Sequence, residues 1–139
     1  MESDVRRIAA SLARLQKQLN VALAQHPDMP VTLPQLMLLN LANRHGPYRL
    51  TELAAKIEVK PSAVTVMVDR LEKRGFVRRV PAPGDRRAVL VEVTDAGRDA
   101  LRQAGDLRSK LLDRIMERLE PAEVKLLADL LERLTGGNA

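Results

Sequence analysis

The sequence predicts a mainly α-helical fold that carries one small β-hairpin, and three observations lead to this fold class. Apolar residues recur at spacings of three and four along most of the 139-residue chain, which indicates amphipathic helices. Two short valine-containing runs, at 76–81 and 88–93, flank the turn residues Pro83 and Gly84, which is typical of a hairpin. Two helices separated by only a few residues lie directly before this hairpin. Together these elements have the outline of a winged helix-turn-helix, with further helices at both ends of the chain.

Positive charge is concentrated between Lys60 and Arg87. This stretch contains eight basic and three acidic residues, and its net charge of 8 − 3 = +5 equals the net charge of the whole chain. The basic residues are Lys60, Arg70, Lys73, Arg74, Arg78, Arg79, Arg86 and Arg87. A cationic surface on an otherwise neutral chain is typical of a protein that binds a phosphate backbone. The alternative is a solvated surface without a partner.

The N-terminal helix is predicted from a heptad pattern. Its apolar residues are spaced 3, 4, 3, 4 and 3 apart, at Val5, Ile8, Leu12, Leu15, Leu19 and Ala22. A seam of this kind packs against another helix, either of the same chain or of a second copy. Pro27 and Pro30 end the helix.

Two shorter helices are expected next. Thr32 and Gln35 form a capping-box pattern that opens the first of them, LPQLMLLNLANRH, which is apolar on most sides and is therefore placed in the interior. Gly46 and Pro47 end it. Thr51 is expected to cap the second helix, TELAAKIEV, whose inward residues are Leu53, Ala54 and Ile57.

The helix before the hairpin begins at Pro61, which suits a first helical turn, and stops at Gly75. Its inward face is an apolar stripe formed by Val64, Met67, Val68 and Leu71. The opposite face consists mostly of short side chains, which let the backbone come close to the floor of a DNA groove. These outward residues are Ser62, Ala63, Thr65, Val66, Arg70 and Lys73.

Two more helices are expected after the hairpin. Thr94 caps a long helix that runs to about Leu119, and Pro121 opens a last helix that stops at Gly136. Amphipathic helices at both ends of so short a chain predict an obligate dimer. We expect residues 1–31 and 98–139 to form a helical dimerisation region around a DNA-binding region at 32–97, all within one intertwined domain.

Several protein classes lack support. The chain has no cysteine, so we expect no disulfide and no thiolate metal site. His26 and His45 have no repeated ligand spacing, and no Ser-His-Asp, Walker or glycine-rich phosphate motif is present, so we expect no metal site, no cofactor and no enzyme. No apolar run reaches the ~20 residues of a membrane span, and no signal peptide opens the chain. We therefore expect a cytoplasmic protein without a membrane partner.

The stretch RLTELAAKIEVKPSAVTVMVDRLEKRGFVRRVPAPGDRRAVLVEVTDAGRDAL resembles the signature region of the MarR family of bacterial and archaeal transcriptional regulators. The most specific part is Asp85-Arg86-Arg87, followed by an apolar strand and by V-T-D-A-G where the family usually has L-T-x-x-G. The resemblance implies a dimer with a winged helix-turn-helix in each lobe and a pseudo-palindromic DNA operator. It also implies that small anionic or phenolic effectors bind between the two parts of the molecule.

The resemblance assigns roles to single residues. It implies that Arg87 enters the minor groove, that Asp85 braces the arginines of the hairpin, and that the helix at Pro61 enters the major groove. Asp85 could instead be only a turn former, and Ser62 and Thr65 could contact phosphates rather than bases. The candidate DNA-binding residues are Ser62, Ala63, Thr65, Val66, Arg70, Lys73, Asp85, Arg86 and Arg87.

An effector cleft is expected between the first two helices and the DNA-reading unit. Its lining would be Leu12, Lys17, Met37, Leu41 and Arg44, with Tyr48 as the only phenol, although Arg44 could equally pair with a surface acid. We therefore expect a homodimeric, sequence-specific regulator of transcription, most often a repressor, that an effector releases from its operator. The alternative is a winged-helix module that binds an acidic protein partner without reading DNA.

Overall fold

The computed structural model describes residues 2–137, which form six helices and three strands within that range. The elements follow one another as α1 (Glu2–Gln25), α2 (Leu33–His45), β1 (Tyr48–Arg49), α3 (Leu50–Ile57), α4 (Pro61–Lys73), β2 (Val77–Ala82), β3 (Asp85–Val93), α5 (Asp95–Met116) and α6 (Pro121–Leu134). The expected mainly helical winged helix-turn-helix, with helices at both ends, is confirmed.

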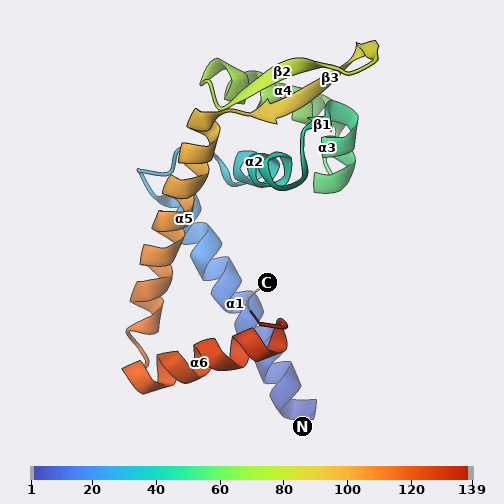
Figure 1. Cartoon of the computed structure of the whole chain (residues 1–139). Helices are drawn as coiled ribbons and strands as arrows, with labels where there is room; N and C mark the ends of the chain where they lie inside the picture. Colours follow the sequence, from blue (N-terminus) through green and yellow to red (C-terminus); the bar gives the residue numbers. More distant parts are fainter. Residues whose placement is uncertain (1, 138–139) are drawn as a thin grey trace.

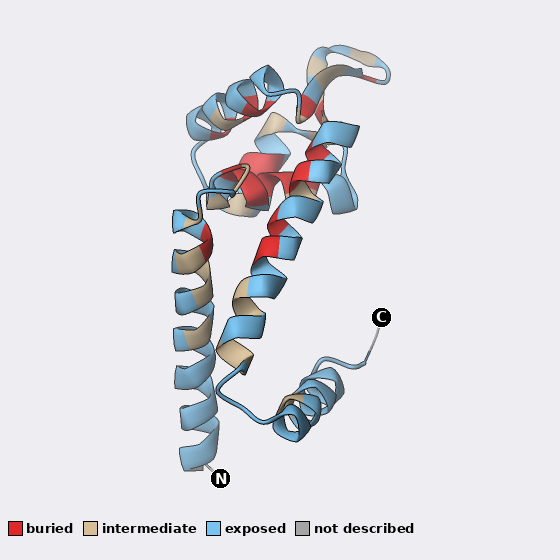
Figure 2. Cartoon of the chain, turned by 90° about the vertical axis from the view of Figure 1, so that its left-hand side faces the viewer, coloured by how far each residue is buried: buried red, intermediate tan, exposed pale blue. Residues whose placement is uncertain are grey.

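The three strands, α2, α3 and α4 gather at one end of the molecule, and the long helices α1 and α5 lead away from them (Figure 1). Helix α6 turns back from the far end of α5 toward α1 (Figure 1). The hydrophobic core lies where the long helices meet the compact end, and most buried residues are there (Figure 2). Its fully buried side chains include Leu23, Leu38, Leu39, Leu53, Leu71, Val64, Val68, Val77 and Val91.

Helix α2 is the interior helix that the sequence predicted. Thr32 Oγ1 accepts a hydrogen bond from the backbone N–H of Gln35, and the Gln35 side chain accepts one from the backbone N–H of Thr32. This reciprocal capping satisfies the Gln35 side-chain oxygen, so the residue can be 8% exposed without leaving that acceptor unpaired. Met37 departs from the expectation, because it is 56% exposed.

The sheet contains a strand that the sequence did not predict. It has the antiparallel order β1-β3-β2, and in the two-residue strand β1 Tyr48 pairs with Val91 and Arg49 with Leu90. Because α3 follows β1 directly, its N-cap is the extended residue Arg49, whose backbone N–H donates to Glu52 Oε1 at 3.1 Å. The expected cap at Thr51 is therefore wrong, since Thr51 already lies within the helix.

The hairpin turn is tighter than expected. Only Pro83 and Gly84 form the turn, and Asp85 to Arg87 already belong to β3. Gly84 adopts φ +77°, a left-handed conformation that glycine reaches without a steric penalty. Helix α5 begins after the expected cap, Thr94, and ends at Met116, three residues before the expected Leu119. Within the described part of the chain, no helix is both long and apolar enough to cross a membrane.

Candidate nucleic-acid interface

Helix α4 is fixed to the core through one face and exposes the other. Val64, Val68 and Leu71 are completely buried, as the apolar stripe predicted. The six outward candidates are all exposed: Ser62, Ala63, Thr65, Val66, Arg70 and Lys73. Val66 is 47% exposed, so an apolar side chain on this face is available to a partner. The structure therefore places these residues together on one solvent-facing surface.

Thr65 already uses its hydroxyl hydrogen. Its Oγ1 donates to the backbone carbonyl of Pro61 at 3.1 Å, one turn earlier in the same helix. A hydroxyl that donates in this way keeps its lone pairs, so it faces solvent as a hydrogen-bond acceptor. An acceptor suits the exocyclic amine of a base better than it suits a phosphate oxygen, which needs a donor.

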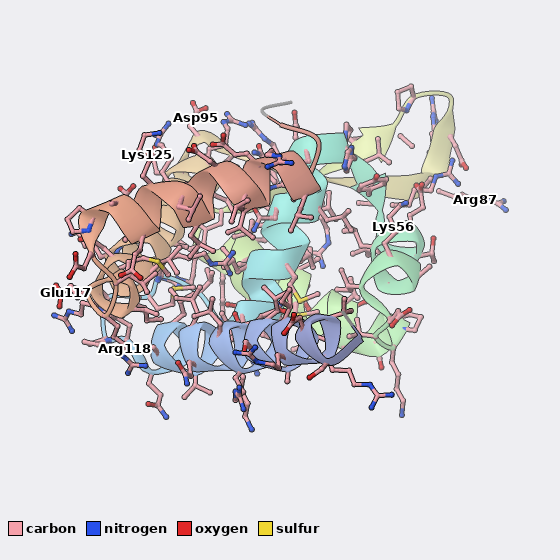
Figure 3. All side chains as sticks on the ribbon, turned by 90° about the horizontal axis from the view of Figure 1, so that it is seen from below. Lys56, Arg87, Asp95, Glu117, Arg118 and Lys125 are labelled. Atoms are coloured by element: carbon pink, nitrogen blue, oxygen red, sulfur yellow. The ribbon has the colours of Figure 1, made fainter. Side chains whose placement is uncertain are left out.

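The hairpin of β2 and β3 extends beyond the body of the molecule (Figure 1). Arg86 and Arg87 are exposed, and the Arg87 side chain points away from the ribbon at the edge of the molecule (Figure 3). The half-buried Asp85 accepts a hydrogen bond from the backbone N–H of Arg87 at 3.0 Å through Oδ1. Among the described residues, no ion pair joins Asp85 to an arginine side chain. Asp85 thus holds the backbone at the base of Arg87 rather than a guanidinium.

Arg79 joins the hairpin to α4, and sequence reasoning gave this residue no role beyond its charge. From β2, its guanidinium donates to Asp69 at 2.5 Å and to Glu72 at 2.6 Å, and its backbone N–H donates to the other Glu72 oxygen at 3.2 Å. The hydrogen bond that Arg79 donates to Asp69 is the largest cause that raises the pKa of Arg79. The hydrogen bond to Glu72 and the charges of both carboxylates raise this pKa further, against the lowering effect of burial. The spacing of Asp69 and Glu72 on one helix face was the available signal.

The cationic surface is smaller than the count of basic residues suggests. Arg79 is paired with α4, Arg78 pairs with Glu92 at 3.4 Å, and Arg74 donates to the carbonyl of Pro30 and stacks 4.7 Å from the Phe76 ring. The other basic side chains of this stretch take part in no ion pair within residues 2–137. They are Lys60, Arg70, Lys73, Arg86 and Arg87, and they lie at or within α4 and on the hairpin.

A groove of about 560 Å³ separates α1, α2, α3 and α5. Of the expected effector residues, Met37, Leu41 and Arg44 line it, whereas Leu12, Lys17 and Tyr48 do not. Its other basic residues are His45, Lys56 and Arg108, and no carboxylate is among its lining residues. Lys56 also lies 5.5 Å from the ring of Tyr48 (Lys56 is labelled in Figure 3). The groove can therefore accommodate an anion.

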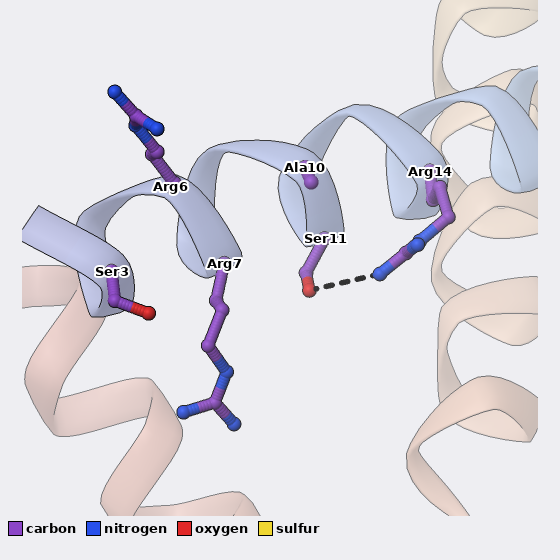
Figure 4. A pocket seen from close by; sticks show the side chains of 6 residues that line it. All are labelled: Ser3, Arg6, Arg7, Ala10, Ser11 and Arg14. Carbon is purple, nitrogen blue, oxygen red and sulfur yellow. Dashed lines mark hydrogen bonds between the residues drawn. The ribbon is translucent and has the colours of Figure 1, made fainter.

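A second basic surface lies on α1, far from the hairpin (Figure 1). Arg6, Arg7 and Arg14 border a hollow of about 760 Å³, in which Arg7 pairs with Asp4 at 3.1 Å and Arg14 donates to Ser11 at 3.4 Å. Arg6 points to one side of the helix whereas Arg7 and Arg14 point to the other (Figure 4). The guanidinium groups do not converge on one point, so the hollow is not a built anion site.

No group of three or more His, Asp or Glu side chains that could hold a metal ion occurs within residues 2–137. The candidate site thus has three parts: the exposed face of α4, the projecting β2–β3 hairpin with Arg86 and Arg87, and the groove between α1, α2, α3 and α5 with its basic lining.

Comparisons with known proteins decide the family. A model of the MarR family matches residues 31–89, which span α2 to the hairpin. An uncharacterised HTH-type transcriptional regulator of Mycobacterium bovis, Mb0904, is 31% identical over 137 residues, which cover 94% of each chain. The chain belongs to the MarR family. It is a transcriptional regulator with the DNA-binding helix-turn-helix of that family.

One further relative and one solved structure extend the comparison. The HTH-type transcriptional repressor MdtR of Bacillus subtilis is 34% identical over 104 residues, which cover 75% of this chain and 67% of the relative. The crystal structure of RV1404 from Mycobacterium tuberculosis aligns with 100% of this chain and 97% of its own, with 33% identity and a TM-score of 0.71. The likeness to RV1404 thus includes the terminal helices α1, α5 and α6 as well as residues 31–89, which the family model matches.

Proposed function

We propose that this MarR-family chain is a homodimeric repressor that reads a pseudo-palindromic DNA operator with α4 and the β2–β3 hairpin. The main support is the position of α4, which buries one face in the core and exposes the other to solvent. Beside it, the hairpin carries two exposed arginines, Arg86 and Arg87. In this arrangement α4 enters the major groove and Arg87 enters an adjacent minor groove. Thr65 accepts a hydrogen bond from a base amine, and Val66 meets a thymine methyl.

The remaining candidates act on the DNA backbone. Arg70 and Lys73 stand on the exposed face of α4 as long cationic side chains, so they neutralise phosphates beside the groove. Ser62 and Ala63 lie in the first turn of α4, where the helix N-terminus favours an anion. Arg86 supplements Arg87, and Asp85 keeps the hairpin backbone in place.

A regulator of this kind works where the chromosome is, so we propose a cytoplasmic location.

The proposed dimer rests on apolar surface that the protomer leaves uncovered. No residue of α6 is buried, and a groove of about 690 Å³ between α1 and α6 is lined largely by aliphatic side chains. Exposed large hydrophobic residues cluster on the same helices, at Val5, Ile8, Leu12, Leu126, Leu130, Leu131 and Leu134. Contiguous exposed apolar surface marks an interface. In this proposal residues 1–31 and 98–139 pack against a second copy, and residues 32–97 read DNA.

Release by an effector is proposed from the groove between α1, α2, α3 and α5. It lies between the helices of the proposed dimer region and those of the reading unit, and its lining carries Arg44, Lys56 and Arg108 without a carboxylate. A small anionic or phenolic molecule there would gain charge-assisted hydrogen bonds. Repression is proposed because the relative MdtR is named as a repressor.

The decisive experiment is selection of bound fragments from the native genome, followed by a salt titration on one selected duplex. We expect specific binding whose affinity falls steeply between 50 and 200 mM salt, as phosphate contacts require. Arg87→Ala should lower the salt slope by about one charge. A protein-interaction module would enrich no sequence and would show no such slope, and this result would refute the proposal.

A further inference from the structure

Through the side chain of Arg79, the hairpin contacts Asp69 and Glu72, two acidic residues of α4. Arg79 is 25% exposed, and it contacts two carboxylates that lie three residues apart on α4. With its backbone N–H it also binds the second oxygen of Glu72, so the contact fixes both the side chain and the strand. A planar guanidinium that binds two carboxylates restricts orientation more than a single ion pair does.

Because Arg79 lies near the base of the hairpin, a small rotation of the strand at Arg79 moves the hairpin turn by a larger distance. Arg79 pairs with Val91, close to the body of the molecule, and the turn residue Pro83 lies four residues further along the chain, just after the end of β2. Four residues of strand span about 13 Å, so a rotation of about 10° at Arg79 would move the turn by about 2 Å. The placement of Arg86 and Arg87 relative to α4 therefore depends on how firmly the base of the hairpin is held.

The contact also changes the charge that α4 presents. Asp69 and Glu72 flank Arg70 and lie beside Lys73, and with Val66 these residues border one shallow depression on the helix surface. Carboxylates so close to a DNA backbone would repel phosphate. Arg79 offsets one of these two negative charges from the hairpin side, so that together with Arg70 and Lys73 the face carries a net charge of −2 + 1 + 2 = +1.

We propose that Arg79 is a positioning residue that fixes the angle between α4 and the hairpin, so that base reading by α4 and minor-groove insertion by Arg87 are coupled. The inference rests on the proposed function, because it presumes that both elements contact one DNA duplex. Arg79 itself need not touch DNA. The alternative is an ion pair that only stabilises the fold.

The strand offers a matched control one residue away. Arg78 points to the other face of the sheet, is 59% exposed, and pairs with Glu92 on the neighbouring strand at 3.4 Å. Arg78→Ala removes the same charge from almost the same place but leaves the link to α4 intact. A general electrostatic effect on DNA binding would appear in both alanine variants.

The test is a set of double-variant cycles on one selected operator at fixed salt. Dissociation constants are measured for Val66→Ala, Arg87→Ala and their combination, in the native chain and in chains that also carry Arg79→Ala or Arg78→Ala. In the native and Arg78→Ala chains, we expect the combined loss to be at least about threefold smaller than the product of the single losses, since coupled contacts are not independent. In the Arg79→Ala chain the two losses should multiply.

Outcomes separate the inference from the proposed function. A native chain without operator preference overturns both. A native chain that prefers the operator, but shows no coupling or keeps the same coupling with Arg79→Ala, overturns the inference alone. Should Arg79→Ala not fold, the pair Asp69→Ala and Glu72→Ala removes both acceptors of the Arg79 guanidinium and must abolish the coupling. Arg79→Lys should restore it only in part, because an ammonium lacks the planar fork.

Discussion

Asp85 acts on the hairpin through the main chain. Its carboxylate accepts the N–H of Arg87 two residues later, so it fixes the backbone from which the Arg87 side chain projects. A bond of this kind needs an acceptor at position 85, and it does not need a charge. This distinction separates two accounts of the acid: one in which it preorganises the hairpin, and one in which its charge acts on the DNA.

Asp85→Ala should weaken operator binding by about two- to tenfold, the equivalent of ~0.5–1.5 kcal/mol for ordering one side chain. Asp85→Asn keeps the acceptor and should bind nearly as well as the native chain. Arg87→Ala should lose more affinity than either, and none of the three should shift thermal unfolding appreciably. Fluorescence anisotropy on one duplex at fixed salt measures this series. If both Asp85 variants bind more tightly, the main effect of the carboxylate is to repel the DNA phosphates, and the proposed role in preorganisation is wrong.

Thr65 provides a test of base reading by a single acceptor. Thr65→Val keeps the shape of the side chain but removes the oxygen, so it should reduce discrimination at one operator position by ~1–3 kcal/mol. Thr65→Ser retains the acceptor and serves as the control. Lys73→Ala should weaken binding to all sequences alike. A randomised operator library decides the matter, and equal losses for Thr65→Val across every sequence would mean that no base is read there.

Residue roles followed from the sequence where one helix determined them. The outward face of α4 was predictable because Val64, Val68 and Leu71 define the buried side by periodicity alone. The role of Arg79 was missed, because its partners lie seven and ten residues away on another element, and the spacing of Asp69 and Glu72 on α4 did not indicate which hairpin residue binds them. The sequence left two roles open for Asp85, a brace for the hairpin arginines and a turn former, and the hydrogen bond that its carboxylate accepts from the Arg87 N–H is of the turn-forming kind.

At the scale of elements, two glycines of α5 occupy opposite environments. A Cβ at Gly97 would lie 2.2 Å from the carbonyl oxygen of Phe76 and 2.8 Å from a methyl carbon of Val93. A Cβ at Gly105 would meet nothing within 4 Å. The first glycine allows α5 to begin directly against the start of the hairpin, where Thr94 Oγ1 also accepts the Gly97 N–H at 3.1 Å. The second has no such contact.

Alanine should therefore change stability in opposite directions at these two sites. Gly105→Ala should raise the free energy of unfolding by ~0.5–1 kcal/mol, because alanine loses less backbone entropy in a helix. Gly97→Ala should lower it by ~1–3 kcal/mol, because backbone must shift to admit the methyl group. Urea denaturation of the two variants measures both values. Stabilisation by Gly97→Ala would contradict the close packing of α5 against the hairpin.

Elements were predicted well where a long pattern specified them and poorly where the chain changes element within two residues. The heptad of α1 and the capping box of α2 were sufficient to place these helices. Strand β1 has only two residues, so it has no alternation to detect, and it forms because Tyr48 and Arg49 pair with β3. Because β1 ends at Arg49, this residue is the N-cap of α3 in place of the expected Thr51, and no local propensity indicates an arginine cap.

At the scale of the whole molecule, the protomer leaves its terminal helices incompletely packed. Leu12 is 52% exposed and borders the groove between α1 and α6, and in the proposed dimer a second copy covers it. The protomer core lies elsewhere and does not contain Leu12. Assembly and protomer folding can therefore be perturbed separately if the reading unit remains stable alone, or together if the dimer is obligate.

Leu12→Asp should dissociate the dimer at micromolar concentration and lower its thermal stability, because an unpaired carboxylate would be buried in the interface. Ala10→Asp adds the same charge on the opposite side of α1, beside Arg6, Arg7 and Arg14, and should leave assembly unchanged. Sedimentation equilibrium with parallel melting curves measures both properties. A native chain that sediments as a monomer, or equal dissociation by the two variants, would argue against the proposed seam.

Helix α5 runs through 22 residues without a break and carries buried side chains at its sheet end and half-buried ones near α6. The helix is about 33 Å long and connects the sheet end of the molecule to α6 as one continuous helix. Each inserted residue would turn one end of the molecule against the other by about 100° and advance it by about 1.5 Å. We therefore expect lineages of this protein to vary in length across α5 only in steps of about seven residues, which restore both faces together.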